Sequence, residues 1–205
     1  MNKKQLTRKV IVYAVYIAIF SSVQVSFSDF LSMNGQIADL MLVFVVITGY
    51  LFGAKDVVVV GLATGFLRDY FSGPAYEGAA DRPRALLGVG MLLLLYAGVL
   101  SAVLFSKAFH RRLPLGFVQI IIITMIYKIF GHFTALMLQI ISGKGSDYLS
   151  FTEIMTGSIF PQLVVNLLAA IPIILLLRYW GPYNRGVNPQ LIDESSTVEG
   201  IWQTR

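Results

Sequence analysis

The sequence predicts an all-α integral membrane protein, built as a bundle of six transmembrane helices. Hydrophobic residues make up 56% of the 205 residues and charged residues only 13%, with a mean hydropathy of +0.72, whereas an average soluble domain carries about 25% charged residues. Six apolar stretches approach the roughly 20 residues that a helix needs to cross lipid. Lys and Arg are also distributed unevenly between the two sides that six crossings define.

The six apolar stretches are separated by polar or basic connections. They cover residues 10–27, 38–53, 56–72, 85–107, 114–141 and 151–179. Only Ala54 and Lys55 separate the second stretch from the third, so this short pair is interpreted as a tight helical hairpin or a re-entrant pair. The predicted organisation is one membrane domain, residues 1–180, and a polar tail, 181–205, that we expect to be largely disordered because it lacks apolar periodicity.

The basic residues predict that both ends of the chain lie in the cytoplasm. Of the 16 Lys and Arg residues, 11 fall on the side of the two termini in a six-span arrangement, four fall on the other side, and Lys128 lies within a span. Cytoplasmic loops carry an excess of Lys and Arg, which sets this orientation. The net charge of +5 is therefore explained by topology, and no nucleic-acid partner is expected.

Lys128 lies in the middle of the fifth stretch, about 20 Å from either end at the helical rise per residue. A lysine side chain reaches only about 6 Å, so its ammonium must face protein or a water-filled cavity. It is interpreted either as part of a ligand, proton or interface site, or as a buried lysine that only fixes helix packing. Asp69 is the first candidate for its counter-ion and Glu153 the second.

Other polar residues share a helix face with Lys128 or lie at a similar depth. Residues four or seven apart lie on one helix face, as Thr124, Lys128, His132 and Gln139 do. The predicted intramembrane polar cluster consists of Asp69, Lys128, His132, Gln162 and Asn166. These residues could line one outward-facing cavity. The alternative is a set of separate interhelical hydrogen bonds, each worth about 0.6 kcal/mol.

The sequence offers no catalytic or metal-binding set. It contains no cysteine and only two histidines, and no Ser-His-Asp grouping with supporting context is present. We therefore expect no catalytic residues, no metal, no cofactor and no enzymatic activity.

Small residues spaced four apart mark two faces where helices can approach closely. Gly61 and Gly65 are expected to pack within the bundle. Ala14 and Ala18 on the first span are expected either to pack there or to face a partner.

The stretch from Ala38 to Leu87 resembles a known family. The segment Ala38-Asp39-Leu40-Met41-Leu42, an acidic residue opening a hydrophobic helix, resembles a segment of the bacterial rod-shape-determining protein MreD family. The run from Gly65 to Gly73 (GFLRDYFSG) resembles that family's glycine-hydrophobic-aspartate segment, and Leu87-Gly88 resembles the Leu-Gly that follows it. The family often has proline before the first aspartate, where this chain has Ala38, and the loop Pro74–Arg84 is longer than the family's usual connection.

The resemblance implies a non-enzymatic, multi-pass component of the bacterial cytoplasmic (inner) membrane that controls rod shape and peptidoglycan synthesis. Members of the family bind MreC directly and join MreB, RodA and its partner transpeptidase, directly or through MreC. A homo-oligomer is also left open. The family's fold looks like the six-helix substrate-binding subunits of vitamin transporters, whose first helix contacts a coupling subunit through an Ala-xxx-Ala face like that of Ala14 and Ala18. The alternative function is therefore that of a substrate-binding subunit of a vitamin or small-molecule transporter.

Overall fold

The computed structural model describes residues 3–26, 31–71, 88–104, 113–141 and 154–183. Over these residues the chain forms six α-helices, one π-helical turn and one small two-stranded sheet. In chain order the elements are α1 (Lys3–Ser26), β1 (Ser32–Met33), β2 (Gln36–Ile37), α2 (Leu40–Phe52), α3 (Ala54–Phe71), α4 (Val89–Leu104), α5 (Leu113–Ile141), the π-helix η2 (Met155–Ile159) and α7 (Phe160–Trp180). The predicted helical architecture is confirmed over these residues, and each predicted stretch corresponds to one helix.

Three of these helices are long and apolar enough to cross a membrane. They are the segments Gln5–Ser26 of α1, Pro114–Thr134 of α5 and Met155–Trp180, which runs through η2 and α7. Helices α2 and α4 are shorter apolar helices. At 13 residues α2 is only about 20 Å long, less than the thickness of a typical hydrocarbon core.

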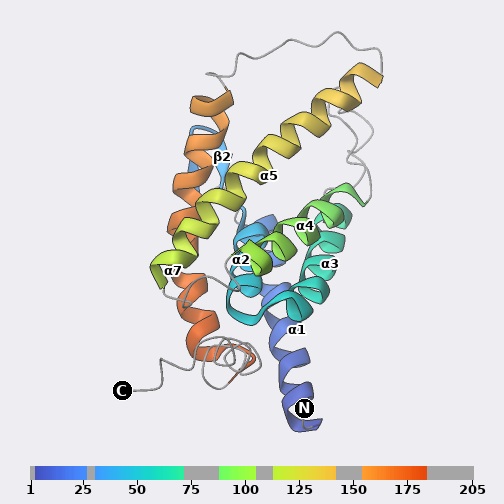
Figure 1. Cartoon of the computed structure of the whole chain (residues 1–205), viewed down its shortest axis with the longest axis vertical. Coiled ribbons are helices and arrows are strands. Elements are labelled where there is room, and N and C mark those ends of the chain that lie inside the picture. Colours follow the sequence, from blue (N-terminus) through green and yellow to red (C-terminus); the bar gives the residue numbers. More distant parts are fainter. Residues whose placement is uncertain (1–2, 27–30, 72–87, 105–112, 142–153, 184–205) are drawn as a thin grey trace.

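Helix α2 forms the centre of the molecule. Every residue from Met41 to Phe52 is buried, and α2 contacts α1, α3, α4, α5 and α7. Figure 1 shows α2 between α7 on one side and α3 on the other, with α4 running across it and α5 passing diagonally above. A helix that is apolar on all faces is stable only when it is surrounded, which explains why the most hydrophobic short stretch of the chain lies in the core.

Helices α2 and α3 are joined by a tight turn, as both predicted arrangements require. Gly53 alone separates them, with a φ of 86° that favours glycine. Its N–H donates to the carbonyl of Gly49, and its own carbonyl accepts from Val57 at 3.1 Å. The first turn of α3 therefore begins directly where α2 ends.

Helices α3 and α4 approach closely because glycines remove side chains from their contact. A Cβ on Gly65 would lie 2.4 Å from the backbone Cα of Met91, and a Cβ on Gly61 would lie 3.2 Å from the Cα of Leu95. The face of Gly61 and Gly65 is thus used for packing within the chain. Ala14 and Ala18 of α1 are exposed instead.

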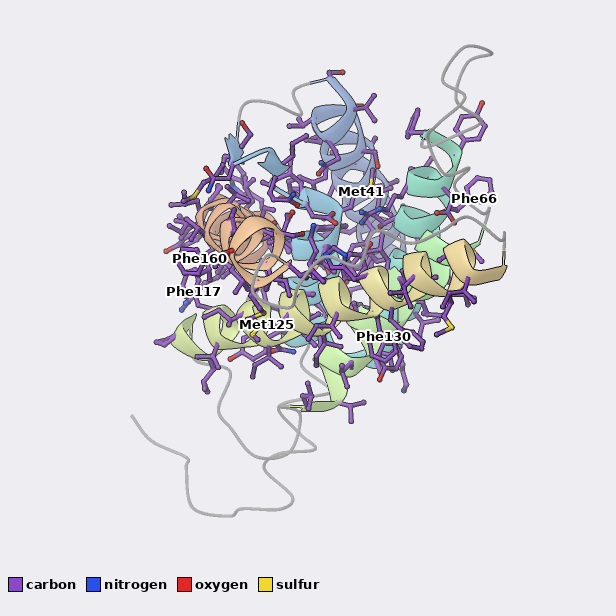
Figure 2. The ribbon with its side chains drawn as sticks, turned by 90° about the horizontal axis from the view of Figure 1, so that it is seen from above. Met41, Phe66, Phe117, Met125, Phe130 and Phe160 are labelled. Atoms are coloured by element: carbon purple, nitrogen blue, oxygen red, sulfur yellow. The ribbon has the colours of Figure 1, made fainter. Side chains whose placement is uncertain are left out.

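Large apolar side chains also cover much of the outer surface. In Figure 2 Met41 lies among the helices, whereas Phe66 of α3, Phe130 of α5 and Phe160 of α7 point outwards; these three phenylalanines are 53%, 47% and 61% exposed. Soluble monomers rarely expose so much apolar surface. The surface is therefore suited to lipid or to partner helices.

The small sheet was not predicted. Strands β1 and β2 pair antiparallel, with Ser32 opposite Ile37 and Met33 opposite Gln36. The turn residues Asn34 and Gly35 have φ values of 50° and 75°, as a two-residue hairpin of the Asn-Gly type requires.

We expect Gly65→Val to destabilise the protein by about 1–3 kcal/mol or more, because the new side chain must displace the backbone of α4. Thermal unfolding of the purified protein in mild detergent measures this loss. Gly131→Ala on α5 is the matched control, since a Cβ there would meet no atom within 4 Å. Equal stability of the two variants would contradict the close α3–α4 contact.

Candidate functional site

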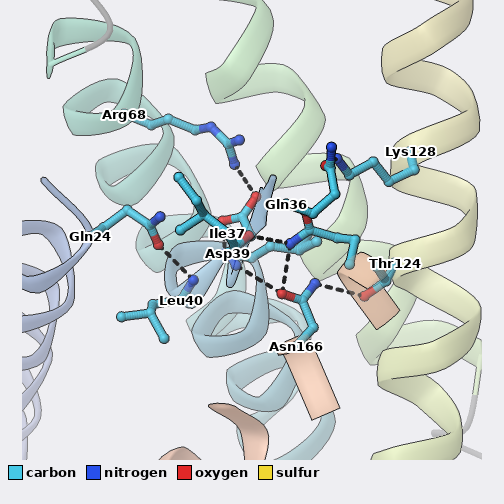
Figure 3. Close-up of polar contacts among 11 residues, drawn as sticks. Gln24, Gln36, Ile37, Asp39, Leu40, Arg68, Thr124, Lys128 and Asn166 are labelled. Carbon is cyan, nitrogen blue, oxygen red and sulfur yellow. Dashed lines mark hydrogen bonds and ion pairs between the residues drawn. The ribbon is translucent and has the colours of Figure 1, made fainter. Parts of the chain in front are cut away.

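A polar cluster lies where the β-hairpin meets five helices (Figure 3). It joins the end of α1, the start of α2, the end of α3 and the middle of α5 and α7. We define the polar cluster as Gln24, Gln36, Asp39, Arg68, Thr124, Lys128, Gln162 and Asn166. Gln36 and Lys128 bond to each other, and the other six bond to one another or to the backbone of residues 37–40.

Asp39 connects α2 to α3. Its carboxylate accepts from the N–H of Leu42 at 3.0 Å, which caps the first turn of α2, and from Arg68 Nη1 at 2.7 Å. The Asp39 and Arg68 side chains are 13% and 31% exposed, so the ion pair is partly buried. The Arg68 guanidinium also lies 5.4 Å from the centre of the Tyr127 ring, a cation–π contact that anchors α3 to α5.

The start of α2 receives two further side chains from distant parts of the chain. The N–H of Leu40 donates to Gln24 Oε1 of α1 at 2.7 Å, and the N–H of Asp39 donates to Asn166 Oδ1 of α7 at 2.8 Å. The first N–H groups of a helix have no partner within the helix. Here the bundle supplies side-chain oxygens in place of water.

Gln162 and Asn166 connect α7 to α5 and to the hairpin. Gln162 Nε2 donates to the carbonyl of Ile37 at 2.7 Å and to Asn166 Oδ1 at 3.0 Å. Asn166 Nδ2 donates to Thr124 Oγ1 at 3.2 Å. Both amides are buried. The predicted pairing of Gln162 and Asn166 on one helix face is present, and both contribute to the polar cluster.

Lys128 joins the same cluster through the hairpin. Its Nζ donates to Gln36 Oε1 of β2 at 2.8 Å, and the side chain is only partly buried. Its described polar partner is therefore a neutral amide rather than a carboxylate. Glu153, the second candidate counter-ion, lies outside the described residues, as does the side chain of Gln139.

Asp69 is occupied elsewhere, which corrects its assignment as the first candidate counter-ion of Lys128. Its Oδ2 accepts from the N–H of Gly88 at 2.7 Å and from the N–H of Met91 at 3.1 Å. Gly88 directly precedes α4 and Met91 lies in its first turn, so Asp69 caps that helix from α3. A carboxylate is stabilised at a helix N-terminus because the unpaired N–H groups carry partial positive charge.

His132 lies one turn beyond Lys128 on α5, and Nε2 lies 3.3 Å from Ser158 Oγ of η2. It forms a separate contact between α5 and the π-helical turn. The five predicted site residues therefore divide: Lys128, Gln162 and Asn166 belong to the polar cluster, whereas His132 and Asp69 make contacts of their own.

Sequence reasoning missed Asp39, Arg68, Gln24 and Gln36 as members of the site. Asp39 carries a recognisable signal, because an aspartate directly before an apolar run is a typical helix N-cap. No partner was predicted for Arg68. Nothing in the spacing of Gln24 and Gln36 indicates that they meet α2 and α5.

A second polar site surrounds Asp56 at the opposite end of α3. The Asp56 side chain is 1% exposed and forms an ion pair with Lys9 Nζ. It also accepts from Tyr13 Oη at 2.7 Å and from Tyr183 Oη at 2.8 Å. We call Lys9, Tyr13, Asp56 and Tyr183 the Asp56 cluster. Burial, together with the hydrogen bond to Asp56, raises the pKa of the Tyr183 phenol above its ordinary value, so Tyr183 stays a neutral donor at physiological pH.

The first residues of the predicted tail thus pack against the helices. Tyr183 contacts Asp56, and Arg8 of α1 donates to the carbonyl of Gly181 at 3.4 Å. Residues 184–205, the rest of the tail, lie outside the described part of the chain.

Over the described residues, no three His, Asp or Glu side chains are placed to hold a metal ion together. Comparisons with known protein families, with curated proteins and with solved structures find no match for this chain.

We expect Asp69→Asn to be nearly neutral and Asp69→Leu to cost about 1–2 kcal/mol. An asparagine oxygen still accepts from the two N–H groups at the start of α4, whereas leucine leaves both without a partner. Thermal unfolding of the two variants measures the difference. If Asp69→Asn were as damaging as Asp69→Leu, the charge of Asp69 would matter more than its capping bonds.

We expect Asp56→Asn to destabilise the protein by a few kcal/mol, because it removes the negative charge that holds Lys9. The double variant Asp56→Asn/Lys9→Met should recover part of the loss, since no ammonium is then left beside a neutral amide. Unfolding temperatures of the single and double variants form the test. Strictly additive losses would show that Lys9 and Asp56 do not interact.

Proposed function

We propose that this chain is a non-enzymatic membrane scaffold of the bacterial elongation machinery, which binds MreC and thereby controls rod shape and peptidoglycan synthesis. The observation that carries the proposal concerns the MreD-like segment. Asp39 caps α2 and pairs with α3, Gly65 admits the backbone of α4, and Asp69 caps α4. The residues that carry the resemblance therefore build a frame of three helices, as expected of a scaffold.

The proposed topology is six crossings of the cytoplasmic membrane, with both ends in the cytoplasm. The start of α1, the α2–α3 turn and the end of α7 meet at one end of the molecule, as the Lys9–Asp56 pair and the Arg8–Gly181 contact show, and Figure 1 shows α1 and α7 reaching the same end. Most of the described basic residues gather there, namely Lys3, Arg8, Lys9, Lys55 and Arg178. An excess of Lys and Arg marks the cytoplasmic side.

Helix α1 offers a surface for a single-span partner such as MreC. Ala14 and Ala18 are exposed on it, with Val15 and Ile19 beside them at 49% and 47% exposure. Small residues four apart allow another helix to approach closely in lipid. Through MreC the scaffold would join MreB, RodA and its partner transpeptidase.

The alternative proposal is a substrate-binding subunit of a vitamin or small-molecule transporter. The observation that favours it is Lys128, which has a neutral amide as its described partner. A small molecule that co-purifies with the protein and is identified by mass spectrometry would support this alternative.

We expect MreC to co-purify with the tagged full-length protein from bacterial membranes in mild detergent, whereas an unrelated single-span membrane protein does not. We further expect Ala14→Leu/Ala18→Leu to weaken this association, because the larger side chains hold the partner helix away. Val59→Leu, at a 66% exposed position on α3, is the matched control. Absence of MreC from the wild-type eluate would refute the scaffold proposal. If MreC were lost equally from Ala14→Leu/Ala18→Leu and from Val59→Leu, only the assignment of the binding surface to α1 would be refuted.

A further inference from the structure

The polar cluster has more positive than negative charge. Its charged members are Asp39, Arg68 and Lys128. The Asp39 carboxylate is already used twice, by the N–H of Leu42 and by Arg68. Asp69, the next carboxylate along α3, is bound to the start of α4. Among the residues that the structure describes, both carboxylates are therefore engaged by donors other than Lys128, although the charge of Asp69 also acts on its neighbour Arg68.

Lys128 is the cation of the cluster that has no carboxylate bonded to it among the described residues. Its ammonium has three N–H donors, and the structure gives it one described acceptor, the neutral Gln36 Oε1 at 2.8 Å. A lysine away from bulk water is costly unless other acceptors or an anion compensate it. His132, the next polar group on this face, lies against Ser158 and brings no negative charge.

There is room for a ligand beside this ammonium. Gly131 follows Lys128 by three residues on α5 and so lies on nearly the same helix face. A Cβ built on Gly131 would meet no atom within 4 Å. Figure 3 shows Arg68 and Lys128 reaching towards each other from opposite sides of Asp39 and Gln36. The open space thus adjoins Lys128, and Arg68 approaches this lysine from another helix.

We propose that the polar cluster binds a phosphate group at Lys128, beside Gly131, with Arg68 as the second cation. Arg68 has N–H donors that its bond to Asp39 does not use. A planar guanidinium with several donors, combined with the compact charge of a lysine ammonium, suits the oxygens of a phosphate. The phosphate would belong to a lipid headgroup or to a soluble compound. This inference does not depend on MreC binding.

The test is thermal unfolding of the full-length protein in neutral detergent, followed by intrinsic fluorescence. One arm compares a short-chain phosphatidylglycerol with phosphatidylcholine of the same chain length. The other compares sodium phosphate with sodium chloride at equal ionic strength. We expect an anion-specific rise in Tm, on the order of 5 °C at a concentration about 100 times Kd. A rise in the lipid arm alone identifies a headgroup, and a rise with free phosphate identifies a soluble ligand.

Variants locate the effect. Lys128→Gln should abolish the rise, and so should Gly131→Leu, which keeps the charge but fills the space and has no atom nearby to clash with its Cβ. Lys55→Gln, an exposed lysine at the other end of α3, should keep it. If Lys128→Gln did not fold, the anion-dependent change in the Tm of Gly131→Leu would still test the proposal. The proposal is overturned if neither phosphatidylglycerol nor phosphate raises Tm, which is the result expected if a carboxylate of the chain itself binds Lys128. It is also overturned if the Tm of Gly131→Leu responds to the anion as the wild type does.

Discussion

A helix enclosed by other helices has no water at its ends, and α2 is in that situation. Its first turn needs acceptors for N–H groups that no residue within the helix can pair. Gln24, Asp39 and Asn166 provide them from α1, from the chain just before α2, and from α7. Because three distant segments must meet at one point to satisfy a short apolar helix, the positions of α1 and α7 are fixed relative to the core. Arg68 adds α3 to the same point through its pair with Asp39.

The Asp56 cluster and the polar cluster, at the two ends of the bundle, differ in how their charged groups are partnered. At the Asp56 cluster one carboxylate is surrounded by donors from α1 and from the segment after α7, and its ion pair with Lys9 balances its charge. At the polar cluster the carboxylate of Asp39 is fully engaged while a second cation stays beside a neutral amide. The first arrangement is complete as a structural clamp. In the second, the ammonium of Lys128 has a neutral amide as its one described acceptor, which is why only the second carries a binding proposal.

The sequence predicted the helices well because long apolar stretches have few alternatives, and the order and approximate bounds of all six agree with the structure. Partners across the bundle were harder to predict. Asp69 was matched with Lys128 because opposite charges within a membrane are expected to pair, yet the N–H groups of α4 compete for the same carboxylate. Gln162 and Asn166 were found because their spacing places them on one face. Gln36 was not found because its hairpin is only two residues long on each side, too short for a periodic pattern, although Asn34-Gly35 is a typical turn sequence.

The contact of Tyr183 with Asp56 has a mechanical consequence. Tyr183 lies three residues after the end of α7, and its hydroxyl is bonded to a carboxylate that also binds α1 and stands in the first turn of α3. A pull on the chain beyond this tyrosine would therefore load that carboxylate before it loads α7 alone. Helices α1, α3 and α7 would share the force through the side chain of Asp56. A tether attached to the C-terminal residues would therefore strain the whole core rather than detach α7 alone.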